Sequence, residues 1–266
     1  MADAVSSSST VKIIFTIARN TFREAVRDRV LYNLVLFVLL ITASAIFLGE
    51  LTAGQEARTI VNLGLSAMLL FGAFISIFVG VSLVSKEIEK RTIYAIFSKP
   101  IGRGEFIVGK YLGLCLTLLV NILIMGIGVS LALLYVGGGK LAFSIWGAVF
   151  LIFLELSILT GVAILFSSFS SPSLSALLAF FIFIIGHFSA SLKDFANRLG
   201  SNFAKIFFDA IYYLLPNLSF YEFVTNAAHG DVPSFSMFAG AALYAVFYVS
   251  VLLAITILIF SRRNFK

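Results

Sequence analysis

Residues 107–136 read IVGKYLGLCLTLLVNILIMGIGVSLALLYV, an apolar run in which Lys110 is the single charged side chain. A helix rises about 1.5 Å per residue, so roughly 20 apolar residues cross the hydrocarbon core of a bilayer. This run is longer than that length. It predicts a membrane-spanning helix that tilts or extends past the headgroups.

Five other apolar stretches have spanning length, at about 31–49, 62–84, 144–166, 174–192 and 237–260. Of the 266 residues, 60% are hydrophobic and 12% are charged, which leaves too little polar surface for a water-soluble globule. The sequence therefore predicts an all-α polytopic membrane protein with six transmembrane helices. We expect residues 1–266 to form a single transmembrane domain in contact with the lipid bilayer.

The distribution of Lys and Arg predicts the orientation of these spans. With the N-terminus inside, fourteen of the 19 basic residues fall on the cytoplasmic side and five on the outer side. Cytoplasmic connections are the ones enriched in Lys and Arg. We therefore expect a multi-pass protein of the cell's inner (plasma) membrane with both termini cytoplasmic. The formal charge of +6 then reflects contact with anionic headgroups, and no nucleic-acid partner is predicted.

Two segments outside the predicted spans are an amphipathic stretch before the first span and a long connection before the last. Residues 10–29 place apolar and basic side chains on opposite sides of a helix, with Thr10 as the N-cap, which predicts an amphipathic interfacial helix. Residues 193–236 form the one long outer connection, and we expect short helices there. Its length motivates the hypothesis that this extracytoplasmic segment docks another protein.

The densest charge cluster lies between the second and third spans, where residues 85–106 read SKEIEKRTIYAIFSKPIGRGEF. An apolar stripe lines one face of a helix that Pro100 and Gly102 end. It consists of Ile88, Thr92, Ile93, Ile96 and Phe97. Two interpretations stay open: a solvated loop helix, or an element that docks in the groove of a partner.

This segment, continued by Gly109-Lys110-Tyr111-Leu112-Gly113, resembles the loop after the second span in permeases of the ABC-type-2 exporter family. The resemblance also covers the N-terminal helix, the six spans, Leu215-Pro216-Asn217 and the basic end at Arg262-Arg263. It looks closest to the branch with the permease of the nitrous-oxide-reductase maturation system and the sodium-exporter permeases.

The resemblance implies an ATP-driven exporter in which two permease copies, as a homodimer or a related heterodimer, bind two cytoplasmic ABC ATPase subunits. Residues 85–100 would be the coupling helix, seated in a groove of the ATPase. Glu87, Arg91 and Arg103 would make polar contacts, and Ile93, Ile96 and Phe97 would form the apolar anchor. Thr92 and Pro100 belong to the same motif.

The segment Gly104 to Lys110 matches a phosphate-binding loop except at its last position, where Tyr111 replaces Ser or Thr. It follows a proline-ended helix instead of a strand, so we expect no nucleotide site here. The chain is predicted not to be an enzyme: it has no catalytic residues and no cofactor, and the partner ATPase binds ATP and Mg. No metal site is expected either.

Two polar residues lie within the predicted spans. Glu155 is central in the fourth, where a charged carboxylate costs roughly 2.5–3.5 kcal/mol. It would serve as a cation or proton relay, or as a polar contact between permease copies. Alternatively, it is a protonated Glu bonded to Ser157, Thr160 or Asn121. His187 is expected to be a neutral polar residue near the outer interface.

Two rival functions follow from these features: a self-contained ion-coupled secondary carrier that uses Glu155, and a non-transporting scaffold for envelope assembly.

Small residues in two spans predict close helix packing. The patterns Gly109-x-x-x-Gly113 and Gly72-x-x-x-Ser76 should permit close approach of neighbouring helices.

Overall fold

The computed structural model describes residues 2–26, 36–37, 40–41, 43–44, 47, 55–89, 101–189, 191, 194 and 202–262. All regular elements in these ranges are helices. The prediction of an all-α protein is therefore confirmed. Helices are expected in lipid because each main-chain amide and carbonyl must find its partner within the segment.

Four described helices are long and apolar enough to cross a membrane: α3 (Glu56–Glu89), α5 (Arg103–Tyr135), α6 (Gly139–Ser167) and α11 (Phe235–Arg262). They correspond to the second, third, fourth and sixth predicted spans. The fifth corresponds to α7 (Pro172–His187), which is shorter than the predicted 174–192 because Phe188 forms a turn after it. The first, 31–49, lies mostly outside the described residues.

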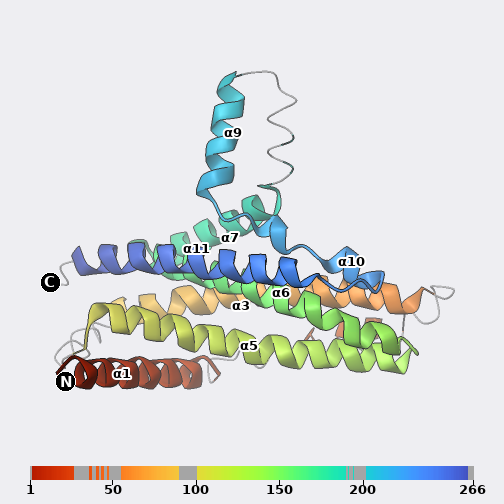
Figure 1. Ribbon diagram of the computed structural model, residues 1–266, viewed down its shortest axis with the longest axis horizontal. Helices are drawn as coiled ribbons and strands as arrows, with labels where there is room; N and C mark the ends of the chain where they lie inside the picture. Colours follow the sequence, from red (N-terminus) through yellow and green to blue (C-terminus); the bar gives the residue numbers. More distant parts are fainter. Residues whose placement is uncertain are drawn as a thin grey trace.

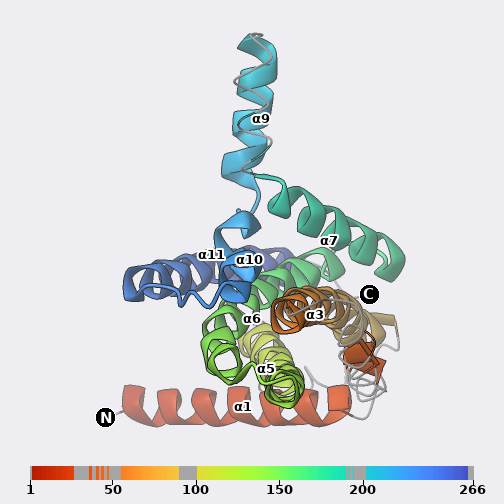
Figure 2. The ribbon, with the colours of Figure 1, turned by 90° about the vertical axis from the view of Figure 1, so that its right-hand side faces the viewer.

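The spanning helices run side by side, with α6 at the centre (Figures 1 and 2). In the most apolar window of α6, 72% of residues are buried, against 28% in α11. We call the end where α3 ends and α5 begins the loop end. The opposite end, where Val136 to Gly138 join α5 to α6, is the hairpin end.

The chain reverses sharply at the hairpin end. Gly137 has φ +79°, a left-handed conformation that side-chain-bearing residues avoid, and the Gly138 amide donates to the Leu133 carbonyl at 2.8 Å. At the loop end, Pro172 occupies the first turn of α7 after extended Ser171, as proline's fixed φ favours. Local sequence thus sets where α5, α6 and α7 begin and end.

A stripe of small residues brings α3 against α6. A Cβ on Gly72 would lie 2.2 Å from Cδ1 of Leu156. One turn on, the Ser76 hydroxyl donates to the Leu156 carbonyl at 3.2 Å, and the oxygen of the Thr160 hydroxyl lies 3.3 Å from that of Ser76. Close approach at Gly72-x-x-x-Ser76 is therefore confirmed, and it satisfies a hydroxyl inside the membrane.

Helix α1 (Ala2–Ala25) lies across the spans at the loop end, beneath α5 (Figure 2). It begins before Thr10, so the predicted N-cap at that residue was wrong. Thr21 and Ala25 are buried towards the bundle, whereas Val11 and Phe15 are 66% and 68% exposed. An apolar face that is only partly covered is what a helix at a lipid interface presents.

Three short helices occupy the described part of the long connection between α7 and α11: α9 (Asn202–Leu214), the 3-10 helix η2 (Leu218–Tyr221) and α10 (Val224–Ala228). Helix α9 stands out from the bundle at a steep angle to the spans (Figures 1 and 2). Helix α10 instead packs on α3 and α6, with Ala227 and Ala228 buried. This connection therefore contributes to the interior of the bundle.

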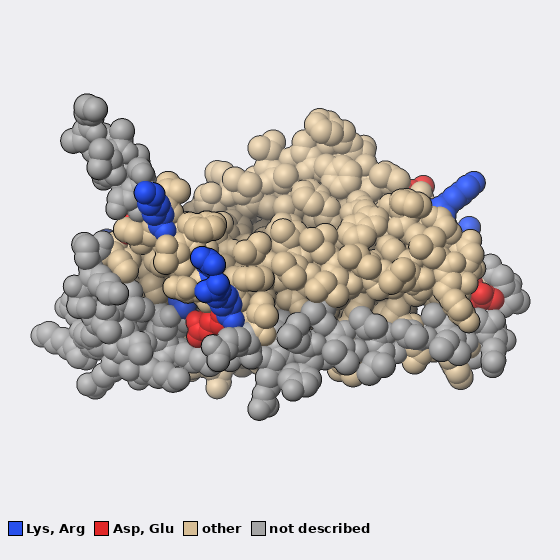
Figure 3. Space-filling model, turned by 90° about the horizontal axis from the view of Figure 1, so that it is seen from below, with Lys and Arg blue, Asp and Glu red and all other residues tan. Residues whose placement is uncertain are grey.

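The charged side chains visible from below lie near the two ends of the molecule, and the described surface between them is uncharged (Figure 3). Large apolar side chains such as Leu131, Leu243 and Phe247 are 61% to 71% exposed on the spanning helices. Apolar surface of this extent is stable in hydrocarbon and unstable in water.

Candidate functional site

The predicted coupling segment continues directly from α3. Residues 85–89 form the last turn of that helix, so the main chain of Glu87 is helical. Residues 90–100 lie outside the described residues, and with them the six remaining positions of the predicted coupling motif that precede α5. These are Arg91, Thr92, Ile93, Ile96, Phe97 and Pro100. Their role in ATPase coupling stays a prediction.

Arg103, which follows this segment, is the first residue of α5. Its Nη1 donates to the Phe260 carbonyl at 2.9 Å and to the Ser261 carbonyl at 2.5 Å, near the end of α11. Below it, the rings of Phe106 and Phe260 stack with centroids 5.9 Å apart. The start of α5 is thereby joined to the end of α11.

The same turns of α5 press against α1. A Cβ on Gly109 would lie 2.7 Å from Cβ of Ile17, and one on Gly113 would lie 2.6 Å from the Ala18 carbonyl oxygen. Close approach at Gly109-x-x-x-Gly113 is confirmed, and the partner is the amphipathic helix. Only glycine lets the two backbones meet at this separation.

A half-buried ion pair lies beside these glycines. Lys110 Nζ is 3.5 Å from Oε2 of Glu24 on α1, and its side chain is 4% exposed against 44% for Glu24. The ammonium also lies 5.8 Å from the centre of the Phe106 ring. We call Arg103, Gly109, Lys110 and Gly113, with their contacts on α1 and α11, the loop-end clamp.

The residues that nearly match a phosphate-binding loop lie in the same part of the structure as the loop-end clamp. Residues 104–110 are the opening turns of α5, and the Glu105 carboxylate accepts the Gly102 amide at 3.0 Å to cap them. A phosphate-binding loop needs successive main-chain amides that point at the ligand. Here all but the first amides are committed to the helix.

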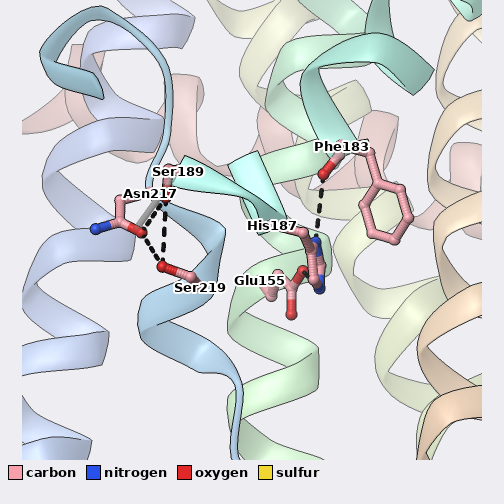
Figure 4. Close-up of polar contacts among 6 residues, drawn as sticks. All are labelled: Glu155, Phe183, His187, Ser189, Asn217 and Ser219. Atoms are coloured by element: carbon pink, nitrogen blue, oxygen red, sulfur yellow. Dashed lines mark hydrogen bonds and ion pairs between the residues drawn. The ribbon is translucent and has the colours of Figure 1, made fainter. Parts of the chain in front are cut away.

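A second polar site lies inside the bundle, between α6 and α7. Glu155 is 1% exposed, and its Oε1 is 3.4 Å from Nε2 of His187 (Figure 4). The two atoms are at ion-pair distance without the alignment of a hydrogen bond, and no hydrogen bond in the described structure reaches Oε1. The imidazole also packs at 4.7 Å, centre to centre, on the ring of Phe183.

The main chain fixes the tautomer of this imidazole. Nδ1 of His187 lies 3.3 Å from the Phe183 carbonyl oxygen, and a carbonyl only accepts. Nδ1 therefore carries a hydrogen, which leaves Nε2 to face the Glu155 carboxyl group. Nε2 then faces the carboxyl group as a proton acceptor, or as a second donor if the imidazole is protonated.

The hydrogen-bond partners predicted for Glu155 were wrong. The hydroxyls of Ser157 and Thr160 donate to carbonyls of their own helix at 2.8 Å, and the Asn121 amide donates to Thr117 at 2.7 Å. Residues at i+2 and i+5 lie on other sides of α6 from Glu155. The partner comes from the next helix.

A cavity of about 620 Å³ opens beside this pair, between α3, α6, α7 and the segment from η2 to α10. Glu155 and His187 line it, together with Asn62 and Ser66 of α3 and Glu222 after η2. Sequence reasoning missed these last three. The i, i+4 spacing of Asn62 and Ser66 within an apolar helix was the available signal, since it places both on one face.

The cavity wall is held by an anchor around Asn217 (Figure 4). The hydroxyls of Ser189 and Ser219 donate to its side-chain oxygen at 2.7 and 2.6 Å. Its main-chain amide donates to the Tyr244 hydroxyl of α11 at 3.0 Å. These bonds fix the chain between the end of α7 and η2, just before the residues that line the cavity.

Apolar spans around a buried polar pair, with an amphipathic helix clamped at one end, define a multi-pass α-helical membrane protein. The family model described as "ABC-2 family transporter protein" matches residues 15–265. The chain belongs to this family. The family resemblance stated from residues 85–113 is thereby confirmed, and the protein is an ABC transporter permease by family.

Two curated relatives carry the name "Probable ABC transporter permease protein NosY". The one from Pseudomonas aeruginosa (strain PAO1) is 27% identical over 105 residues, which is 38% of each chain. The one from Stutzerimonas stutzeri is 25% identical over 138 residues, or 50% of each chain. The matches thus cover half or less of these relatives.

Proposed function

We propose that this chain is the membrane-spanning permease subunit of an ATP-driven ABC exporter. Separate cytoplasmic ATPase subunits would bind ATP and Mg, and residues 85–100 would pass their motion to the spans. The output would be export or a conformational signal across the membrane. In this proposal the loop end faces the cytoplasm of the cell's inner membrane, and a second permease copy completes the transporter.

The loop-end clamp carries this proposal. Residues 90–100 connect the end of α3 to the start of α5, and α5 is fixed there to α1 and α11 by a main-chain contact, an ion pair and two hydrogen bonds from Arg103. A displacement applied to this segment would move three helices as one unit. Packed elements move in this way because close-packed interiors do not deform continuously.

The test is co-purification in mild detergent after co-expression with an ABC ATPase encoded beside the gene. Ile93→Asp and Phe97→Asp should abolish recovery of the ATPase, because each places a charge in the predicted apolar anchor. Phe143→Asp is the matched control: Phe143 is 80% exposed near the start of α6, at the hairpin end. Equal ATPase recovery from wild type and both anchor variants would refute the proposal.

A second candidate function is an ion-coupled carrier, which the contact between Glu155 and His187 favours. Buried carboxylate–imidazole pairs are components of proton pathways in membrane transporters. Proteoliposomes that contain the permease alone should then acidify in response to an imposed potential, and Glu155→Gln should abolish the signal. If proteoliposomes that contain the permease alone do not acidify, the ion-coupled carrier is refuted.

A further inference from the structure

The cavity beside Glu155 has the composition of a site for an amphiphilic ligand. Its volume of about 620 Å³ falls within the range of roughly 300–1,000 Å³ that small-molecule sites occupy. Most of its described wall is apolar, from Leu69, Leu70, Ile152, Phe183, Ile184 and Val224. Such a wall accommodates a hydrocarbon or aromatic body and offers few polar contacts.

Apart from the His187 imidazole, the polar groups at this cavity are acidic or uncharged. Glu155 supplies a carboxyl oxygen that is buried and without a hydrogen bond, and Glu222 supplies an exposed carboxylate. Asn62, Ser66, Thr225 and the Tyr221 hydroxyl are the uncharged polar groups, and the Tyr221 hydroxyl donates to the Ala241 carbonyl. A ligand that complements this wall carries a positive charge.

We propose that this cavity binds a small apolar molecule bearing one organic ammonium group, with the Glu155 carboxylate as its counter-ion. The ammonium hydrogens would fill the unused acceptor capacity of Oε1. A divalent metal is a poorer fit, because no cluster of three His, Cys, Asp or Glu able to hold one occurs among the residues that the structure describes.

Binding of the cation releases one proton. In the ligand-free site we take one proton to reside on Glu155 or on Nε2 of His187, so that the pair is neutral as a whole. With the ammonium bound, Glu155 is a carboxylate and His187 a neutral imidazole with hydrogen on Nδ1. That proton therefore leaves to solvent as the ammonium enters, and the charge of the site is conserved. Acidification then weakens binding, since protons and ligand compete for Glu155.

The isolated permease should bind the amine without ATP or an ATPase. The idea that this amine is exported cargo rests on the function proposed above. The two proposals can be tested separately. If an ATPase co-purifies with a permease that does not bind amines, the exporter proposal stands and the amine site is refuted. If the permease binds amines but no ATPase co-purifies, the amine site stands and the exporter proposal is refuted.

The experiment is fluorescence titration of purified permease in nanodiscs with dansylcadaverine, a fluorescent primary amine, and with its N-acetyl derivative. We expect the amine to bind about tenfold more tightly than the neutral derivative, the effect of one charged hydrogen bond. Glu155→Gln should reduce this preference to less than about twofold. Glu56→Gln, the same change at the hairpin end of α3 outside the cavity wall, should keep it.

Two further measurements keep the test decisive. Ser66→Phe places a ring in the cavity without altering the carboxylate, and should weaken both compounds, which covers the case in which Glu155→Gln fails to fold. Titration in weakly buffered solution with a pH dye should show release of one proton per amine bound. Equal affinity for the two compounds in wild type, or loss of preference in Glu222→Gln but not Glu155→Gln, would overturn the assignment.

Discussion

The Arg103 guanidinium donates to the main-chain carbonyl of Phe260, 157 positions later in the chain. The last carbonyls of a helix lack intrahelical partners, and a cation there also opposes the negative end of the helix dipole. Arg103 thus caps α11 while it begins α5. The residue predicted for an ATPase contact has a structural role, and its contact with the ATPase stays a prediction.

Replacement of this cap should weaken the loop end. Arg103→Ala removes charged hydrogen bonds worth about 1.5–3 kcal/mol each when buried, and about half of that at this partly exposed position. We expect a lower midpoint of thermal unfolding for the detergent-solubilised permease. Arg262→Ala, which removes an exposed charge from the same end of α11, is the matched control. Identical midpoints for the two variants would contradict the capping role.

A methyl group on Gly113 should separate α1 from α5. Its carbon would lie 2.6 Å from the Ala18 carbonyl oxygen, so one backbone has to move, at a cost of about 1–3 kcal/mol. Gly104→Ala is the control on the same helix, because its Cβ would meet only Ile257 at an ordinary 3.7 Å. Both variants are compared by thermal unfolding and by ATPase activity of the assembled complex. A Gly113→Ala variant as stable as Gly104→Ala would refute the close contact.

The contact between Lys110 and Glu24 is suited to a charge-reversal cycle. Lys110→Glu and Glu24→Lys should each lower stability, and the double variant should recover about 1 kcal/mol of the summed loss, modest because Glu24 is 44% exposed. The recovery should shrink in high salt, which screens exposed charges. Strictly additive losses would show that the two side chains do not interact.

Asn217 should be the most sensitive residue of the connection between α7 and α11. Asn217→Ala removes the acceptor of two hydroxyls and should cost about 2–3 kcal/mol, from two lost bonds and two hydroxyls left to reorient. Asn217→Asp keeps the acceptor and should cost less. Asn226→Ala, which removes an exposed amide from α10, should have little effect. Thermal unfolding of the three variants gives the order, and any other order would argue against the anchor.

The spans were predictable because hydropathy and length are properties of single segments. The small-residue patterns at Gly72 and Gly109 were predictable for the same reason, since each reports one face of one helix. The partner of Glu155 was not. It depends on how α6 and α7 are rotated about their axes after a turn at Ser168 to Ser171, and this rotation is set by packing across the whole bundle.

The same limit applies at the loop end. The sequence predicted α1 as amphipathic, but the rotation that sets Glu24 beside Lys110 follows from the glycines of α5. It also placed Arg103 in the coupling motif without its carbonyl partner, because Phe260 is distant in sequence. Glu222 lies in a long connection between predicted spans, and only the packing of α10 on α3 and α6 brings it to the cavity.

The bond from Ser76 to the Leu156 carbonyl has a consequence for biosynthesis. The two residues are 80 positions apart, and a ribosome that adds about 5–20 residues per second takes roughly 4–16 seconds to cover that interval. During this delay Ser76 has been made, while the Leu156 carbonyl that accepts its hydrogen bond has not. We therefore expect α3 and α6 to pair only after residue 156 has been made, and a chain that ends before this residue to leave the small-residue stripe of α3 without its partner.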